Sequence, residues 1–292
     1  MRIPFLILGF CLTPLAWACI HGPEGYEGEF HQEGQQALAV WDGGQEDLFL
    51  RPTVVFEEDA PAEIAWVIPV PSVPSHYAED KGRALEDLVK RYRDLTRPRS
   101  ARNGPPTDSV ESFDDDASKS MELLEAKVAG DYTIQPIKAH GEAGAKALGE
   151  WLQTNGFGVV PAENMRYYVE REWVWLCVKA KPSGRKAKLA PLQITFATPR
   201  VVYPLKFSTH QGTFALELFV VTKAPCPEVT RQAKPYGLQH RSLELELPAS
   251  TAAALKGAKL SGKVSLTRLY HPGLSGETII GWERDLALTP AP

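Results

Sequence analysis

The stretch that decides the fold is AWVIPVPSVPS, which runs from Ala65 to Ser75. It begins as a continuous apolar run, which is typical of a buried strand, and it contains three prolines. In a strand, the N–H groups of residues two apart point toward the same edge. Because proline has no N–H, Pro69 and Pro71 remove donors from one edge, while Val70 can still donate from the other. The stretch therefore predicts a strand at the border of a sheet, with its donor-poor edge facing outward or covered by a loop.

Two strands are predicted before this one and a helix after it. Gln36–Trp41 and Glu46–Phe56 are strand-like runs separated by the turn signal Asp42–Gly44. Together with Ile64–Val70 they predict an antiparallel meander with short connections. Apolar residues at helical spacing then predict an amphipathic helix over residues 82–95: Leu85, Leu88, Val89, Tyr92 and Leu95.

The segment 96–120 is predicted to be a flexible loop. It begins basic and becomes acidic, and its only larger apolar residues are Val110 and Phe113. Such a segment cannot bury enough apolar surface to form a core of its own. Loops of this length are usually either functional or disordered, and we expect disorder.

The rest of the chain predicts a hairpin, two helices and a series of strands. The hairpin joins 121–127 to 132–139 around Gly130–Asp131, and the helices end at Asn155–Gly156 and cover 162–172. A short helix is expected near 250–255, and strands at 173–181, 191–197, 201–209, 213–223, 241–247, 260–270 and 277–288. This order predicts an α+β fold with antiparallel sheets, built from a meander and hairpins, with a central helical pair.

A weak internal repeat is compatible with two related β lobes. LRPTVVF followed by AWVIPVPS is similar to LAPLQITF followed by VVYPLKFS. We divide the chain into a signal peptide (1–18), a β meander plus helix (19–95), the flexible loop (96–120) and an α+β portion (121–292). The last portion is expected to pack with the N-terminal part, as one large domain or two tightly packed lobes.

The N-terminus has the features of a secretory signal peptide. Arg2 provides a positive charge, Ile3–Leu12 is a short apolar run, and Ala16–Ala18 matches the small-x-small cleavage pattern. We therefore expect an exported protein, either periplasmic or secreted, whose mature form begins at Cys19. A lipid on Cys19, which would give a lipid-anchored envelope protein, is the alternative.

Cysteine usage leaves the pairing of the mature chain open. After removal of Cys11 with the signal peptide, Cys19, Cys177 and Cys226 remain, an odd number for an oxidising compartment. Cys177 lies in an apolar strand, where a buried inert thiol is the usual case. Cys226 lies between two prolines and is the expected disulfide partner of Cys19.

Net charge and hydropathy exclude two classes of protein. The formal net charge is −4, which argues against a general nucleic-acid binder, since such proteins need a basic face to bind phosphates. Nothing after residue 20 approaches the long apolar run that a membrane-spanning helix needs, so we expect no transmembrane anchor.

Five blocks of the sequence stand out together: ALAVWDGGQEDLFLRP, EIAWVIPVPSVP, ALGEWLQTNGFGVV, EWVWLCVKAKP and PLQITFATPRVVYPLKFS. In this order they resemble the bacterial family known as domain of unknown function 2330, from about Gln32 to about Thr222. The resemblance implies an exported envelope protein. Many members of the family end in a transmembrane anchor, whereas this chain ends in WERDLALTPAP, and we expect a soluble or lipid-tethered form. The family has no established activity, so no catalytic residues carry over.

Four aromatic residues are the candidate ligand-binding site. Tyr167, Tyr168, Trp173 and Trp175 could line a groove for a peptide or a glycan, or they could form a core layer where a helix meets a sheet. The acidic turn with Asp42, Glu46 and Asp47 could bind calcium, but a solvated hairpin tip is the simpler interpretation, and so is a solvated loop for Asp114–Asp116.

The sequence indicates no catalytic residue, metal site or cofactor. The histidines are scattered, no serine has the spacing of a nucleophile elbow, and Cys177 with a distant histidine such as His210 is a remote thiol candidate. We expect an exported, non-catalytic module that binds or scaffolds an envelope protein, peptide or glycan. The alternative is a secreted hydrolase whose site is assembled from residues distant in sequence.

Overall fold

The computed structural model describes residues 20–23, 26–81, 83–96, 120–208, 212–280 and 284–291. The predicted signal peptide, Cys19, Asp114–Asp116 and all but the two end residues of the predicted loop 96–120 lie outside these residues. Their predicted properties therefore stay predictions.

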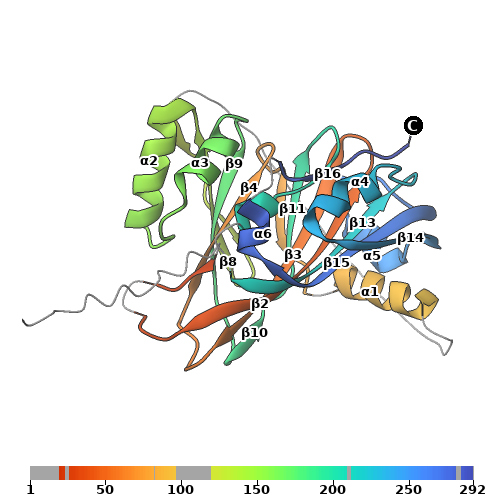
Figure 1. Ribbon diagram of the computed structural model, residues 1–292, viewed down its shortest axis with the longest axis horizontal. Coiled ribbons are helices and arrows are strands. Elements are labelled where there is room, and N and C mark those ends of the chain that lie inside the picture. The colour runs from red at the N-terminus through yellow and green to blue at the C-terminus, as the bar shows by residue number, and fades with distance from the viewer. Residues whose placement is uncertain are drawn as a thin grey trace, which may run out of the picture.

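The larger of two main sheets is seen on the right of Figure 1. Within the described residues it has eight strands: β2 (Phe30–Trp41), β3 (Gln45–Phe56), β5 (His76–Glu79), β10 (Lys186–Lys188), β11 (Leu192–Ala197), β13 (Thr213–Thr222), β14 (Gln239–Glu246) and β15 (Lys263–Ser275). Their order is β14-β15-β13-β2-β3-β11-β5, and β10 pairs with β3 beside β11. Neighbouring strands are antiparallel except β2 and β13, which pair in parallel.

The smaller main sheet lies beside the larger one. Its six described strands are β1 (Ile20–His21), β4 (Ile64–Val70), β6 (Met121–Leu123), β7 (Lys127–Ala129), β8 (Tyr132–Ala139) and β9 (Val174–Ala180). They are antiparallel in the order β1-β4-β9-β8, and both β6 and β7 pair with β8. A short separate pair joins β12 (Val201–Tyr203) to β16 (Leu286–Leu288).

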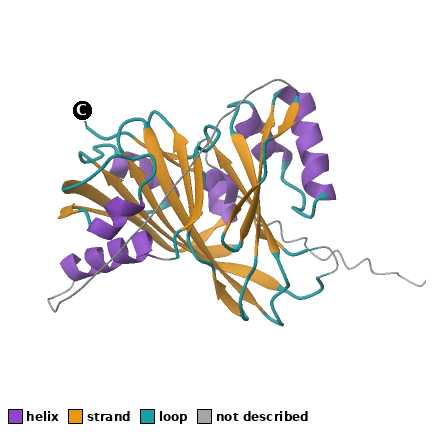
Figure 2. Cartoon of the chain, turned by 180° about the vertical axis from the view of Figure 1, so that it is seen from behind, coloured by secondary structure: helices purple, strands orange, loops and turns teal. Residues whose placement is uncertain are grey.

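Helices cover outer sides of the two sheets, and α6 lies between them (Figures 1 and 2). The described α-helices are α1 (Arg83–Thr96), α2 (Gly141–Thr154), α3 (Ala162–Val169), α4 (Val229–Ala233), α5 (Ala249–Ala254) and α6 (Gly276–Ile280), and two 3₁₀ helices are η1 (Leu205–Ser208) and η2 (Lys234–Tyr236). The pair α2 and α3 lies against the smaller sheet, and α1 lies against the larger one. None of the described helices is long and apolar enough to span a membrane.

The core explains why the central strands are apolar on both faces. In β2, Ala37 and Ala39 face the large core shared with the smaller sheet. Leu38 and Val40 alternate with them and face a second core under α1. Burial of each such Leu or Val side chain contributes roughly 1.5–3 kcal/mol, so a strand covered on both faces is favoured over an exposed one. The fold is thus mixed α+β and mostly sheet, which confirms the predicted class.

Two prolines within strands of the smaller sheet, Pro69 and Pro136, lie where a described partner strand is missing on one side. Pro69 pairs with Trp175 of β9 on one side, and on the other side the described residues of β1 pair only with Ala65 and Trp66. Among the described residues Pro69 therefore has a partner strand on one side only, while Pro71 follows the end of β4. Pro136 lies between the segments of β8 that pair with β6 and β7, again where no ladder partner is lost.

Three sequence predictions about strands are wrong: one about pairing and two about the residues that a strand covers. Ile64–Val70 does not complete a meander with β2 and β3, because β4 crosses into the smaller sheet and pairs with β9. All seven residues of β4 are buried, so this strand needs cover on both faces. The strand predicted over 201–209 ends at Tyr203, because Pro204 interrupts it and the chain continues as η1. The strand predicted over 277–288 is replaced by α6, followed by the short β16.

The internal repeat does not correspond to two lobes. Its first segments lie in β3 and β11, which pair with each other in one sheet. Its second segments lie in β4 and β12, which belong to different sheets. Similar strand sequences here reflect similar burial rather than two equivalent units.

Candidate functional site

The four aromatic residues singled out by the sequence come together between α3 and β9. The ring centroid of Tyr168 lies 4.8 Å from that of Tyr167, 5.1 Å from that of Trp173 and 5.8 Å from that of Trp175. Tyr168 and Trp175 are 0% exposed, whereas Tyr167 and Trp173 are partly buried. The cluster is therefore mainly a core layer where helix meets sheet, and a ligand could reach it only through Tyr167 and Trp173.

A buried carboxyl adjoins this aromatic layer. Asp285 Oδ1 accepts hydrogen bonds from the Tyr168 hydroxyl at 3.0 Å and from the Lys206 backbone N–H at 2.7 Å. Burial raises the pKa of Asp285 to about 7. Such a pKa would suit proton transfer, but a general acid or base must reach its substrate, and Asp285 is only 4% exposed. Asp285 instead ties the C-terminal segment to α3 and η1.

Glu46 and Asp47 are fully buried, so the expectation of a solvated hairpin tip is wrong for them. The Asp47 carboxylate accepts hydrogen bonds from three consecutive backbone N–H groups, those of residues 256–258, and from the side chains of Gln193 and Thr195. Burial raises the pKa of Glu46 well above its usual range. Because protein donors already occupy Asp47, this hairpin is an anchor for the loop after α5 and not a calcium loop.

The two described cysteines, Cys177 and Cys226, are both buried and form no disulfide with each other. Burial raises the pKa of Cys177 and of Cys226, which lowers the fraction of reactive thiolate at neutral pH. The predicted disulfide between Cys19 and Cys226 stays a prediction, since Cys19 lies outside the described residues. The described part of the chain also has no group of three or more His, Cys, Asp or Glu placed to hold a metal ion.

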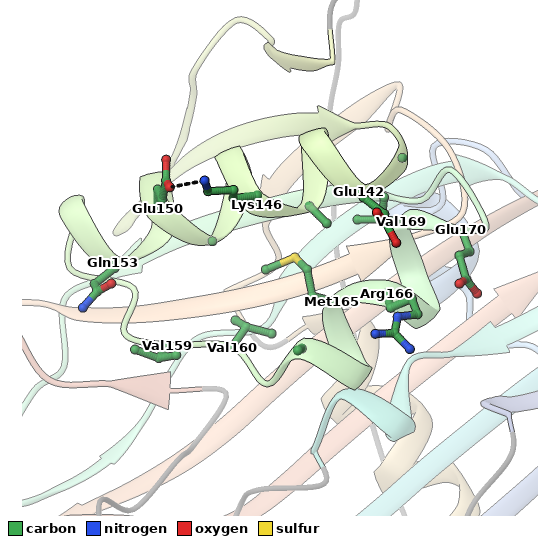
Figure 3. A pocket seen from close by; sticks show the side chains of 14 residues that line it. Glu142, Lys146, Glu150, Gln153, Val159, Val160, Met165, Arg166, Val169 and Glu170 are labelled. Atoms are coloured by element: carbon green, nitrogen blue, oxygen red, sulfur yellow. Dashed lines mark ion pairs between the residues drawn. The ribbon is translucent and has the colours of Figure 1, made fainter.

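An open groove lies between α2 and α3 (Figure 3). It has a volume of about 530 Å³ and runs along the outer side of the helical pair. Its apolar lining includes Ala145 and Gly149 of α2, Met165 of α3, and Val159 and Val160 of the connection between the helices. In Figure 3 the Met165 side chain points across the middle of the groove toward α2.

The connection between α2 and α3 has local signals that end one helix and begin the next. α2 ends at Asn155, whose side-chain amide donates to the Trp151 carbonyl oxygen at 2.8 Å. Gly156 then takes a positive φ of 79°, which suits glycine, and Phe157 turns back to stack on Trp151 with ring centroids 5.7 Å apart. Pro161 precedes the first turn of α3 and fixes where that helix begins.

Small residues on one face of α2 leave room for the groove. Gly141, Ala145 and Gly149 are four residues apart, so they lie on one face of the helix. A Cβ atom at Gly149 would contact only Met165 Cε, at 3.9 Å. Gly144, on another face of α2, is tightly packed instead, since a Cβ atom there would lie 2.3 Å from the Ser120 carbonyl oxygen.

Charged side chains border the groove and are unevenly distributed. Lys146 and Glu150 form an ion pair at 3.9 Å along α2. Glu142, Arg166 and Glu170 gather at the other end in Figure 3, and none of these three side chains forms an ion pair with another described residue. The opposite end is formed by Gln153 and the two valines. The groove is therefore charged at one end and neutral at the other.

A second hollow of about 460 Å³ adjoins the end of α2 and shares Gln153 with the groove. His21 lines it and packs against Gly158. Burial lowers the pKa of His21 to about 4, so its imidazole is neutral at physiological pH. This hollow extends the neutral end of the groove toward the start of the described chain.

A protein-family profile described as "uncharacterized protein conserved in bacteria" (DUF2330) matches residues 15–240. The chain belongs to this family. The resemblance predicted from the five sequence blocks is thus confirmed, and the DUF2330 match includes the whole groove.

This DUF2330 chain was also compared with proteins of curated description and with solved structures. No protein with a curated description matches it. The crystal structure of baculovirus p35 is similar with a TM-score of 0.46 and 11% sequence identity, covering 91% of this chain and 98% of that one.

Sequence reasoning missed the groove in this DUF2330 chain. Its signal is present in residues 141–160, where small residues recur every four positions at Gly141, Ala145 and Gly149 and two valines follow the helix. The apolar periodicity of α2 identifies its buried face through Leu148 and Leu152, but it does not reveal that the neighbouring face is left uncovered.

Proposed function

We propose that this DUF2330 member is an exported binding module of the bacterial envelope, and that the groove between α2 and α3 holds an apolar part of a peptide or protein. Export is supported by the N-terminal sequence, with Arg2, the apolar run Ile3–Leu12 and the cleavage pattern Ala16–Ala18. Binding is supported by the groove, which is the observation that carries the proposal.

The groove has the properties of a binding site for apolar groups. Its volume falls within the range of about 300–1,000 Å³ that is usual for ligand sites. Its lining combines small residues with Met165, whose flexible and polarisable side chain adapts to apolar partners of different shape. Val159, at the neutral end of the groove, is 43% exposed, so an occupant would remove this apolar side chain from water.

A peptide or protein fits this lining better than a glycan does. The hydroxyl groups of a glycan need hydrogen-bond partners, and the apolar middle of the groove, with Ala145, Val160 and Met165, offers none between the polar side chains at its border. A binding role is also better supported than hydrolysis. Two described carboxyls with a pKa raised to about 6 or 7 have structural roles: Asp285 is buried in the core next to Tyr168, and Asp80 accepts the backbone N–H of Ala84 at the start of α1.

Titration with the neutral dye Nile red tests the binding site. We expect dye fluorescence to rise on binding to the mature protein. Gly149→Leu fills the groove and should weaken binding at least about tenfold, as expected for a central contact of a binding site. Ala143→Leu is the matched control, because Ala143 is an exposed residue of α2 outside the groove. Equal binding by Gly149→Leu and the wild type would refute the assignment of the site.

The mass of the protein recovered from the envelope of an expressing bacterium tests export. A mass that corresponds to a chain starting at Cys19 is expected. A lipid-sized increase at Cys19 would identify the lipid-anchored form. A full-length chain confined to the cytoplasm would refute export.

A further inference from the structure

Building on the proposed binding role, we infer that the occupant of the groove is an amphipathic helix of a partner protein, with a basic residue at the end where Glu142 and Glu170 lie. The occupant would complete a three-helix arrangement with α2 and α3. Three features of the groove lead to this inference: its walls, its small residues and the charges at its end.

The walls of the groove favour a helix over an extended peptide. Two helices form them, and the backbone groups of a helix interior are already hydrogen-bonded within the helix. An extended peptide against Ala145 and Met165 would leave its own N–H and C=O groups without partners. A helix satisfies these groups internally and presents only side chains to the apolar lining.

The small residues of α2 allow a helix to approach closely. Gly141, Ala145 and Gly149 present almost no side chain on the face that lines the groove. Small residues at this spacing let two helix backbones come nearer than the usual 8–10 Å between axes. From Gly141 to Gln153 the face is about 18 Å long at 1.5 Å per residue, which corresponds to about three turns of a partner helix.

The charges at one end of the groove favour a positively charged residue at the corresponding end of the partner helix. Glu142 and Glu170 are two exposed carboxylates, and Arg166 is one guanidinium near them. This end therefore has a net charge of −1, and none of the three side chains has an ion-pair partner within the described residues. The charge of Lys146, farther along α2, is already paired with that of Glu150. A Lys or Arg at the corresponding end of the partner helix is complementary to this arrangement.

Two synthetic 18-residue peptides of identical composition test the inference on the full mature protein. In one, leucines recur at i, i+3, i+4 and i+7 with lysines at one end; in the other, the leucines alternate and the lysines stay in place. Fluorescence anisotropy gives their affinities, and circular dichroism shows whether the bound peptide is helical. We expect the helical-pattern peptide to bind at least about tenfold more tightly, and Gly149→Leu but not Ala143→Leu to abolish the difference.

The outcomes separate the inference from the proposed function. If Nile red binds in the groove but the two peptides bind equally or not at all, the helical occupant is wrong and the binding site stands. If Gly149→Leu binds both Nile red and the peptides like the wild type, both proposals fail. A groove filled by a lipid in protein purified from the envelope, or by a second copy so that Gly149→Leu converts a dimer to a monomer, would also overturn the inference.

The charge preference has its own test. Glu142→Gln and Glu170→Gln should each weaken binding of the helical-pattern peptide about two- to fivefold at low salt, as for exposed ion pairs. Glu58→Gln, an exposed carboxylate in the loop after β3, serves as the matched control. Replacement of the peptide's lysines by glutamates should weaken binding further. Equal affinity of the lysine and glutamate peptides would contradict the basic partner end.

Discussion

Two glycines of α2 provide a matched test of how the groove is built. Gly144 and Gly149 both lie within the helix, so replacement of either by alanine gains the same intrinsic helix propensity of about 0.8–1 kcal/mol. Their surroundings differ. At Gly149 the new Cβ atom would make an ordinary contact with Met165 Cε at 3.9 Å. We therefore expect Gly149→Ala to stabilise the protein by about 0.5–1 kcal/mol.

Gly144→Ala should have the opposite effect. The new Cβ atom would lie 2.3 Å from the Ser120 carbonyl oxygen and 3.1 Å from the Ala139 carbonyl carbon, and both are backbone atoms that cannot rotate away. Relief of this contact would displace the Ser120 carbonyl, which accepts a hydrogen bond from the His140 N–H at 2.8 Å. Overpacking costs about 1–3 kcal/mol and a lost hydrogen bond about 1 kcal/mol, against the propensity gain. The expected net loss is about 1–3 kcal/mol.

Urea unfolding followed by circular dichroism measures both variants. The free energies of unfolding of Gly149→Ala and Gly144→Ala should differ by about 2–4 kcal/mol, with unchanged dependence on denaturant concentration. Thermal unfolding should show the same order, with a shift of about 2–4 °C per kcal/mol. Equal stability of the two variants would refute the assignment of one glycine to the open groove and the other to a close backbone contact.

Three further predictions concern the polar groups of the core. Burial raises the pKa of Asp285 from 3.8 to about 7, so between these pH values the folded state retains a proton that the unfolded chain has released. The contribution of Asp285 to the free energy of unfolding is therefore complete below about pH 4 and is lost as the pH rises to 7. Asp285→Asn keeps an acceptor oxygen but cannot ionise. In urea unfolding from pH 4 to 8, the decrease in the free energy of unfolding should be smaller in this variant than in the wild type by up to about 4 kcal/mol, and an unchanged pH profile would contradict the assignment. Asp47→Ala leaves the N–H groups around residues 256–258 without their acceptor, and it should destabilise by at least about 3 kcal/mol in the same assay, whereas a loss below 1 kcal/mol would show that this loop is not anchored there. Tyr168→Phe removes the hydroxyl donor to Asp285 and should cost about 1–2 kcal/mol at pH 8, and an equal cost in the Asp285→Asn background would contradict coupling between the two side chains.

Elements with strong local signals could be predicted from the sequence. The apolar spacing of Leu85, Leu88 and Tyr92 predicts α1, and all three side chains are buried against the larger sheet. Pro69 predicts an edge position, and the described residues of β1 pair only with Ala65 and Trp66 of that strand. Such features depend on residues close together in the sequence, where the periodicity of helices and strands acts directly.

Features that depend on distant partners could not be predicted. Glu46 and Asp47 have the composition of a solvated turn, but Asp47 is buried because the loop at 256–258, some 210 residues later, donates three N–H groups to it. The place of β4 next to β9 likewise depends on a pairing across about 110 residues. No local pattern contains these pairings, because they follow from which surfaces remain to be covered once the sheets form.

In the candidate site, too, some features follow from the local sequence and others depend on packing between distant residues. The sequence correctly brings Tyr167, Tyr168, Trp173 and Trp175 together, since they are close in sequence, but the burial of Tyr168 and Trp175 is decided by packing of α3 against β9 and by Phe207. The groove could not be predicted because it is a space between two helices. Its width follows from the connection with Gly156 and Phe157, which the sequence identifies only as a helix end.

The most direct test of the binding groove is the NMR spectrum of protein with ¹³C-labelled methionine methyl groups. Met165 lines the groove, whereas Met121 lies on β6 outside it, so the protein contains its own control. We predict that addition of Nile red or of the helical-pattern peptide shifts the Met165 methyl signal, leaves the Met121 signal in place, and has no effect on either signal in Gly149→Leu. A ligand that binds with full occupancy while the Met165 signal stays unchanged would contradict the account.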